Sequence, residues 1–69
     1  MTDKKELEIA IIKAGYTKQQ VAARLGLSAM GFYKKINNIT EFKASEIAIM
    51  QKMLNINNIE AIFFANNVE

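Results

Sequence analysis

The chain has 69 residues, of which 51% are apolar, and it contains no cysteine, histidine or proline. This length fits one domain with one hydrophobic core, and the missing residue types exclude disulfides, thiol catalysis and nearly every set of zinc ligands. The formal net charge is only +2, yet residues 13–43 carry six basic side chains and one acidic side chain, a local net charge of +5. The middle of the chain is therefore electropositive.

Helix start and stop signals divide the chain into five predicted helices. Side chains that cap a first helical turn stand at Asp3, Thr17 and Ser28, and the first two have a capping-box partner three residues later. Glycine or asparagine, which tolerate a positive φ, follow most of the segments. The helices are predicted over about residues 4–14, 18–25 and 29–37, between Lys43 and Asn55, and over 59–64.

Apolar side chains recur at helical spacing within these segments, and no segment shows the alternation of a strand. We therefore predict an all-α fold in a single domain over residues 1–69. The expected core consists of Leu7, Ile11, Ala14, Val21, Ala22, Leu25, Leu27, Phe32, Ile36, Phe42, Ile47, Met50, Met53, Leu54, Ile59, Ile62 and Phe63.

Residues 17–37 have the pattern of a helix-turn-helix. The small side chain of Ala22 allows two helices to approach closely, Gly26 permits a sharp turn, and Ser28 begins a second helix that crosses the first. Apolar residues on the inner faces would hold this second helix rigidly. Its outward face would then be able to enter the major groove of DNA.

This segment resembles the phage repressor and Cro family, in which a T-x-x-x-x-A-x-x-x-G-[VIL]-S run precedes the recognition helix. Thr17, Ala22, Gly26, Leu27 and Ser28 occupy those places. The stretches GFYKKIN, EFKASEI and IFF extend the similarity to short Cro-like regulators of phages and prophages of low-GC Gram-positive bacteria. The resemblance implies a five-helix, lambda-repressor-like domain that binds a double-stranded DNA operator and regulates transcription.

The chain departs from the family pattern at three positions. Lys18 stands where glutamine commonly touches phosphate, and Asn38 stands where glycine commonly follows the recognition helix. Lys35 replaces an apolar residue, and Ile36 is expected to take over its core contact. Lysine can still reach phosphate, and asparagine can still form a turn.

The recognition helix and its surroundings supply the predicted DNA contacts. Its N-terminal part and outward face reach base edges, and nearby cations reach phosphates. For the lysines the alternative is a solvated surface, for Met30 a place in the core, and for Asn37 a role in the turn alone. We attribute Gly31 to a close approach of DNA or of the preceding helix. The predicted DNA-binding residues are Lys18, Ser28, Ala29, Met30, Tyr33, Lys34, Lys35, Asn37 and Lys43.

The C-terminal segment is more apolar than one short surface helix requires. Part of it must belong to the core, and Ile62 is assigned there. An apolar patch beside a DNA-binding module also suits a dimer surface, because a symmetric dimer reads two half-sites. We therefore predict an interface with a second copy or a partner repressor around Ile62, Phe64 and Val68, with continued core packing as the alternative.

Composition argues against an enzyme, because the acidic residues are scattered and neither histidine nor cysteine is present. No metal, cofactor or small-molecule substrate is expected. The apolar runs are too short to span a membrane, and we expect a cytoplasmic protein. The modest net charge leaves one alternative function open, a modulator that binds a partner repressor and has weak or no DNA binding of its own.

Overall fold

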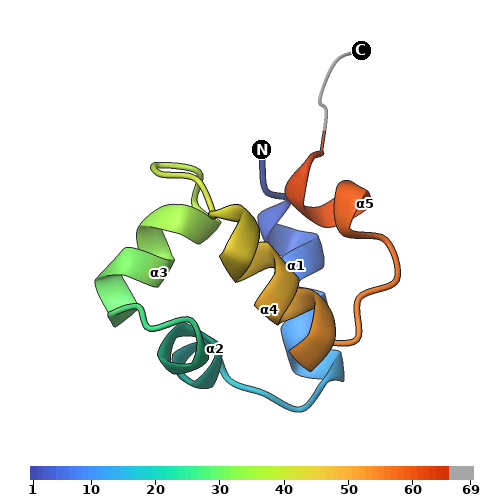
Figure 1. Cartoon of the computed structure of the whole chain (residues 1–69), viewed down its shortest axis with the longest axis horizontal. Helices are drawn as coiled ribbons and strands as arrows, with labels where there is room; N and C mark the ends of the chain where they lie inside the picture. Colours follow the sequence, from blue (N-terminus) through green and yellow to red (C-terminus); the bar gives the residue numbers. More distant parts are fainter. Residues whose placement is uncertain (66–69) are drawn as a thin grey trace.

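Five short helices make up the part of the chain described by the computed structural model, residues 1–65 (Figure 1). The predicted all-α fold class is confirmed, and the helices begin and end within one or two residues of their predicted positions. They are α1 (Lys4–Lys13), α2 (Lys18–Arg24), α3 (Ala29–Ile36), α4 (Ala44–Met53) and α5 (Ile59–Phe63).

Side-chain caps start α2 and α3 as the sequence predicts. At α2 the hydroxyl of Thr17 accepts a hydrogen bond from the backbone N–H of Gln20 at 3.1 Å, and the side-chain oxygen of Gln20 accepts from the N–H of Thr17 at 2.9 Å. At α3 the hydroxyl of Ser28 accepts from the N–H of Gly31 at 3.0 Å. Each cap satisfies backbone donors that have no partner within the helix.

The predicted capping box of α1 forms only in part. The carboxylate of Asp3 accepts from the backbone N–H of Glu6 at 3.2 Å. The backbone N–H of Asp3 donates to the carbonyl of Ile62 at 2.6 Å, so α5 occupies the donor that a full capping box would give to Glu6. The start of α1 is therefore tied to the far end of the chain.

Residues with positive φ follow the first four helices. Gly15 (φ +82°) follows α1 and Gly26 (φ +74°) forms the turn between α2 and α3, while Asn38 (φ +63°) and Asn55 (φ +54°) follow α3 and α4. Glycine and asparagine are the residues that adopt this conformation at least cost. These four positions account for the sharp turns that bring the helices together.

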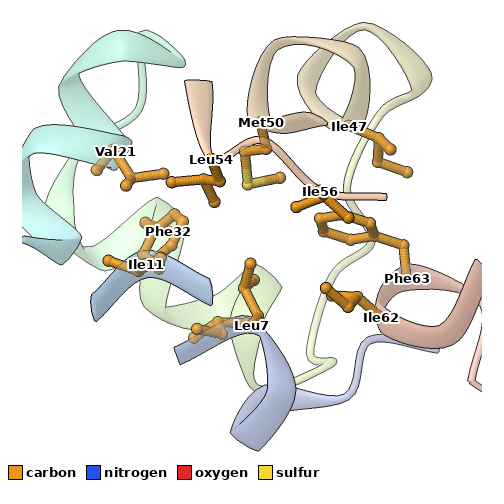
Figure 2. Packing of buried hydrophobic residues seen from close by; sticks show 12 residues of the cluster. Leu7, Ile11, Val21, Phe32, Ile47, Met50, Leu54, Ile56, Ile62 and Phe63 are labelled. Atoms are coloured by element: carbon orange, nitrogen blue, oxygen red, sulfur yellow. The ribbon is translucent and has the colours of Figure 1, made fainter. Parts of the chain in front are cut away.

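All five helices contribute to one hydrophobic core (Figure 2). A row of three aromatic rings crosses it: the rings of Phe32 and Phe42 lie 5.9 Å apart and those of Phe42 and Phe63 5.7 Å apart, both edge to face. The row links α3 to α5 through the connector between α3 and α4. The buried apolar residues are Leu7, Ile11, Val21, Ala22, Phe32, Ile36, Ile47, Met50, Leu54, Ile56, Ile62 and Phe63.

The structure corrects the predicted C-terminal interface at Ile62. Its side chain is only 9% exposed and packs in the core, because α5 turns this face towards the rest of the molecule. Phe64, directly after α5, is 57% exposed. Val68 lies outside the described residues.

Residues 1–3 run between the end of α3 and α5. Thr2 is buried, its backbone N–H donates to the side-chain oxygen of Asn38 at 2.7 Å, and its carbonyl accepts from the side-chain N–H of Asn38 at 2.9 Å. The carbonyl of Met1 accepts from the N–H of Ala65 at 2.9 Å. These bonds connect the end of α3 with the end of α5.

The helix-turn-helix and the C-terminal helix lie at opposite ends of the longest axis, with α2 and α3 at one end and α5 at the other (Figure 1). Along residues 1–65, no helix combines the length and the apolar character needed to cross a membrane.

Candidate nucleic-acid interface

The two faces of α3 differ sharply in exposure. Phe32 and Ile36 are 3% and 2% exposed and anchor the helix in the core. On the opposite face Met30 is 61% exposed and Tyr33 55% exposed, and Lys34 is exposed beside them. A rigidly anchored helix therefore presents large side chains and a cation to solvent. The alternative that placed Met30 in the core is excluded.

The first residues of α3 are also open to solvent. Ser28 and Ala29 are exposed at the N-terminal end of the helix. The oxygen of Ser28 accepts the capping bond from Gly31, which leaves the hydroxyl proton available to donate to a ligand. This end of α3 has the small side chains that a close approach of another molecule requires.

Gly31 is explained differently from our expectation. A Cβ atom at this position would lie 3.3 Å from the hydroxyl oxygen of Ser28 and 3.9 Å from two side-chain atoms of Leu27. The close neighbours are thus the capping residue and the turn before α3, and not α2. A side chain here would press on the cap that starts the helix.

Two exposed lysines lie on α3 and on the connector that follows it. Lys34 lies on the outward face of α3, and its ammonium group forms no hydrogen bond or ion pair with any residue of the described chain, 1–65. Lys43 ends the connector between α3 and α4, with its side chain exposed. Both cations are open to an anionic partner.

Lys35 does not belong with the exposed lysines, contrary to our expectation. Its ammonium lies 2.6 Å from a carboxylate oxygen of Glu46 on α4, and the two side chains are only 12% and 9% exposed. The same oxygen accepts from the backbone N–H of Lys43 at 2.8 Å. Because α3 turns Lys35 towards α4, the residue ties the two helices together and is not presented to solvent.

The electrostatics of Glu46 follow from these contacts. Burial by itself would raise the pKa of the carboxyl group, but the hydrogen bonds from Lys35 and from the backbone of Lys43, with the charges of both lysines, outweigh it and hold the pKa below its usual value. Glu46 is thus ionised at neutral pH. Sequence reasoning missed it, although a lysine at an apolar position of the motif was a signal that a buried acid was near.

Lys18 is exposed at the start of α2 but has a partner. Its ammonium lies 2.5 Å from a carboxylate oxygen of Glu8 on α1, and the two side chains are 53% and 30% exposed. The hydrogen bond from Lys18 holds the pKa of Glu8 below its usual value; desolvation opposes this shift, and the charges of Lys18 and Lys4 add to it. The sequence did not indicate this pairing.

Asn37 has both ends of its amide engaged inside the protein. Its side-chain N–H donates to the carbonyl of Tyr33 at 2.8 Å, and its oxygen accepts from the ammonium of Lys4 at 3.0 Å. The first bond closes the last turn of α3, and the second joins α1 to it. Asn37 therefore shapes the end of the helix, in agreement with the alternative weighed for it.

A groove of about 270 Å³ is lined by residues of α1, α2 and α3 and by Asn37. Its floor is apolar, and its rim carries lysine, amide and phenol groups. It brings Lys4, which sequence reasoning missed, together with residues of the helix-turn-helix. The lining residues are Lys4, Lys18, Gln19, Ala22, Ala29, Phe32, Tyr33, Ile36 and Asn37.

Comparison with known proteins identifies the helical unit that includes α3. Residues 1–38 match the family described as "Bacterial regulatory protein, Fis family", a helix-turn-helix DNA-binding domain. No curated protein and no solved structure matches the chain. The family match begins before α1, ends at the turn after α3, and includes more than half of the 69 residues. The chain therefore belongs to the Fis family of bacterial regulatory proteins.

Proposed function

We propose that this protein is a transcription regulator that binds double-stranded DNA in a sequence-specific manner and catalyses no reaction. One observation carries the proposal: Met30 and Tyr33 are more than half exposed on a helix whose other face is locked into the core. Large apolar side chains that are exposed in the free protein mark a surface that a partner covers. In a helix-turn-helix that partner is the major groove, into which we place α3.

The exposed residues of α3 suit different parts of a base edge. The thioether of Met30 and the methyl of Ala29 fit against thymine methyl groups, and the ammonium of Lys34 fits the O6 and N7 acceptors of guanine. The phenol of Tyr33 and the hydroxyl of Ser28 can donate to a base or a phosphate. These five residues form the proposed reading face.

The proposed phosphate contacts come from the elements before and after α3 in the chain. Lys18 is at the start of α2 and Lys43 is at the end of the connector after α3, and both are exposed. Backbone contacts of this kind fix the register of a protein on the duplex without reading its sequence. Lys35 is left out because Glu46 holds it, and Asn37 is proposed to orient the end of α3.

We further propose that the protein acts as a homodimer in a Cro-like manner, with each copy on one half of an operator. The exposed ring of Phe64 supports a dimer interface beside the end of α5. It borders a hollow of about 120 Å³ together with Met1, Phe42 and Phe63, at the place where residues 1–3 meet α5. A second copy covering this hollow would bury the ring, and paired recognition helices raise specificity.

The test of DNA binding uses fluorescence anisotropy with a duplex selected from a random pool and with an unrelated duplex, each over a series of salt concentrations. Tighter binding to the selected duplex and a steep loss of affinity with salt are expected. Lys34→Ala and Met30→Ala should change the preferred sequence, whereas Lys43→Ala should weaken both duplexes alike. Lys52→Ala removes the same charge from the last turn of α4 and serves as the matched control. Equal affinity for every duplex would exclude sequence-specific regulation.

A second function, binding to a partner repressor, rests on the same exposed Phe64. Phe64→Glu is expected to shift a dimer to a monomer in sedimentation and to lower operator affinity, while the helical circular dichroism is retained. If the wild type is a monomer without affinity for DNA, and gains mass only with a partner repressor that the variant does not bind, the modulator function holds. A variant with unchanged mass and full DNA affinity would place the interface elsewhere.

A further inference from the structure

The acidic side chain of Glu8 lies on the side of α1 that faces the groove. Glu8 is one helical turn after Lys4, and it forms the 2.5 Å ion pair with Lys18 across to α2. Lys4 and Lys18 both line the groove beside α3. A negative charge therefore lies beside the two cations that this groove offers to a ligand.

The two lysines contact oxygen atoms of the protein, as they would contact the oxygen atoms of a bound anion. Lys18 is paired with the carboxylate of Glu8, and Lys4 donates to the amide oxygen of Asn37, which is itself held by the end of α3. Both ammonium groups are thus held at the rim of the groove, on the side of the reading face formed by Tyr33 and Ala29. A duplex on α3 would bring a phosphate of its backbone to the same rim.

We propose that Glu8 is an internal counter-anion of this rim, which a DNA phosphate must displace from Lys18, and that it lowers the affinity of the protein for every duplex. This inference rests on the proposed DNA-binding function. The displacement is feasible because the pair is exposed to water, where such ion pairs are weak. A duplex also has a higher density of negative charge than a single carboxylate, so its phosphates compete effectively for the ammonium of Lys18.

The inference assigns Glu8 and Lys4 roles that the helix-turn-helix pattern does not contain. Lys4 is a further phosphate contact, contributed by α1. Glu8 acts on affinity without reading bases, because phosphates are present in every sequence. It therefore weakens binding to every duplex by the same factor and leaves the preference among sequences unchanged.

The test compares Glu8→Gln with wild type by anisotropy on the selected duplex and on an unrelated one. Glu8→Gln is expected to tighten both by the same factor, about two- to fivefold, which is the range for an exposed pair. Because Lys18 neutralises the same phosphate in both proteins, the slope of log affinity against log salt should differ between them by less than about 0.9, the value for one phosphate. An unequal effect on the two duplexes would contradict the inference.

Glu6→Gln is the matched control. It removes the same charge from the same helix, but Glu6 lines the opposite hollow, beside α5 and the loop after α4. Its effect on affinity should be less than that of Glu8→Gln. In a Lys18→Gln background, Glu8→Gln should lose most of its effect, because the cation that it releases is absent. Equal effects of Glu6→Gln and Glu8→Gln would overturn the inference.

A measurement on the wild type does not depend on any variant. The carboxyl carbon of Glu8, followed by NMR over a pH series, should give a pKa below the usual value in the free protein and a higher one with saturating DNA. An identical pKa in both states would show that Lys18 is not taken from Glu8. If wild type binds DNA and Glu8→Gln changes nothing, the inference alone fails. If neither binds any duplex, the proposed function fails as well.

Discussion

Removing one partner of the Lys35–Glu46 ion pair should destabilise the domain strongly. The side chains of Lys35 and Glu46 are only 12% and 9% exposed, so water screens the attraction between their charges little. Leaving one buried charge without its partner costs about 3–5 kcal/mol. A domain of this size has a total stability of roughly 3–10 kcal/mol, so either Glu46→Gln or Lys35→Met removes a large part of it.

The double variant distinguishes a charge pair from two independent packing losses. In Lys35→Met/Glu46→Gln neither charge remains, so the loss of stability should be smaller than the sum of the single losses by about 1–3 kcal/mol. Urea unfolding at neutral pH, followed by circular dichroism, measures the three free energies. Additive losses, or single losses below about 1 kcal/mol, would refute the argument from burial.

The same variants test the placement of Lys35. Because Glu46 holds this lysine, folded Lys35→Met should bind the selected duplex within about twofold of wild type, which is less than the effect expected for one lost phosphate contact. A tenfold loss of affinity on every duplex would make Lys35 a DNA contact after all.

Three further outcomes follow from burial, hydrogen bonding and charge. Phe32→Ala should lower the stability by about 3–5 kcal/mol because a buried ring is lost, and a melting temperature equal to that of wild type would contradict its place in the core. Asn38→Gly removes both bonds to Thr2 but keeps the positive φ, so urea unfolding should show a loss of about 1–3 kcal/mol. Asn38→Ala should be less stable than Asn38→Gly because it adds backbone strain; the reverse order would exclude strain. Since the folded pKa of Glu46 is lowered, its contribution is complete above about pH 4.5 and lost as the pH falls through the folded value, so Glu46→Gln should flatten the acid limb of the stability curve.

The helices and the exposed outward face of α3 were predictable because their signals are local. Thr17 caps a helix through a residue three positions later, and Gly26 turns the chain by its own φ. On α3, the spacing of Phe32 and Ile36 separates an inner face from the outward face that carries Met30. Each of these signals lies within one or two helical turns of the residue concerned.

The partners of the charged residues were not predictable in the same way. Lys35 meets Glu46, which is 11 residues away, and Lys4 meets Asn37, 33 residues away. Such pairs depend on how the helices cross, which the spacing of apolar residues does not determine. The sequence therefore indicated which lysines lie near the motif, but not which of them are already neutralised by the protein itself.

The row formed by Phe32, Phe42 and Phe63 has a consequence for the entropy of binding. Phe42 belongs to the connector of residues 37–43, which has no regular helix, and its ring is held between a ring of α3 and a ring of α5. A connector fixed in the free protein has little conformational freedom left to lose. Ordering a flexible segment costs about 1–2 kcal/mol per residue, and the proposed contact of Lys43 with DNA would not include that cost for this connector.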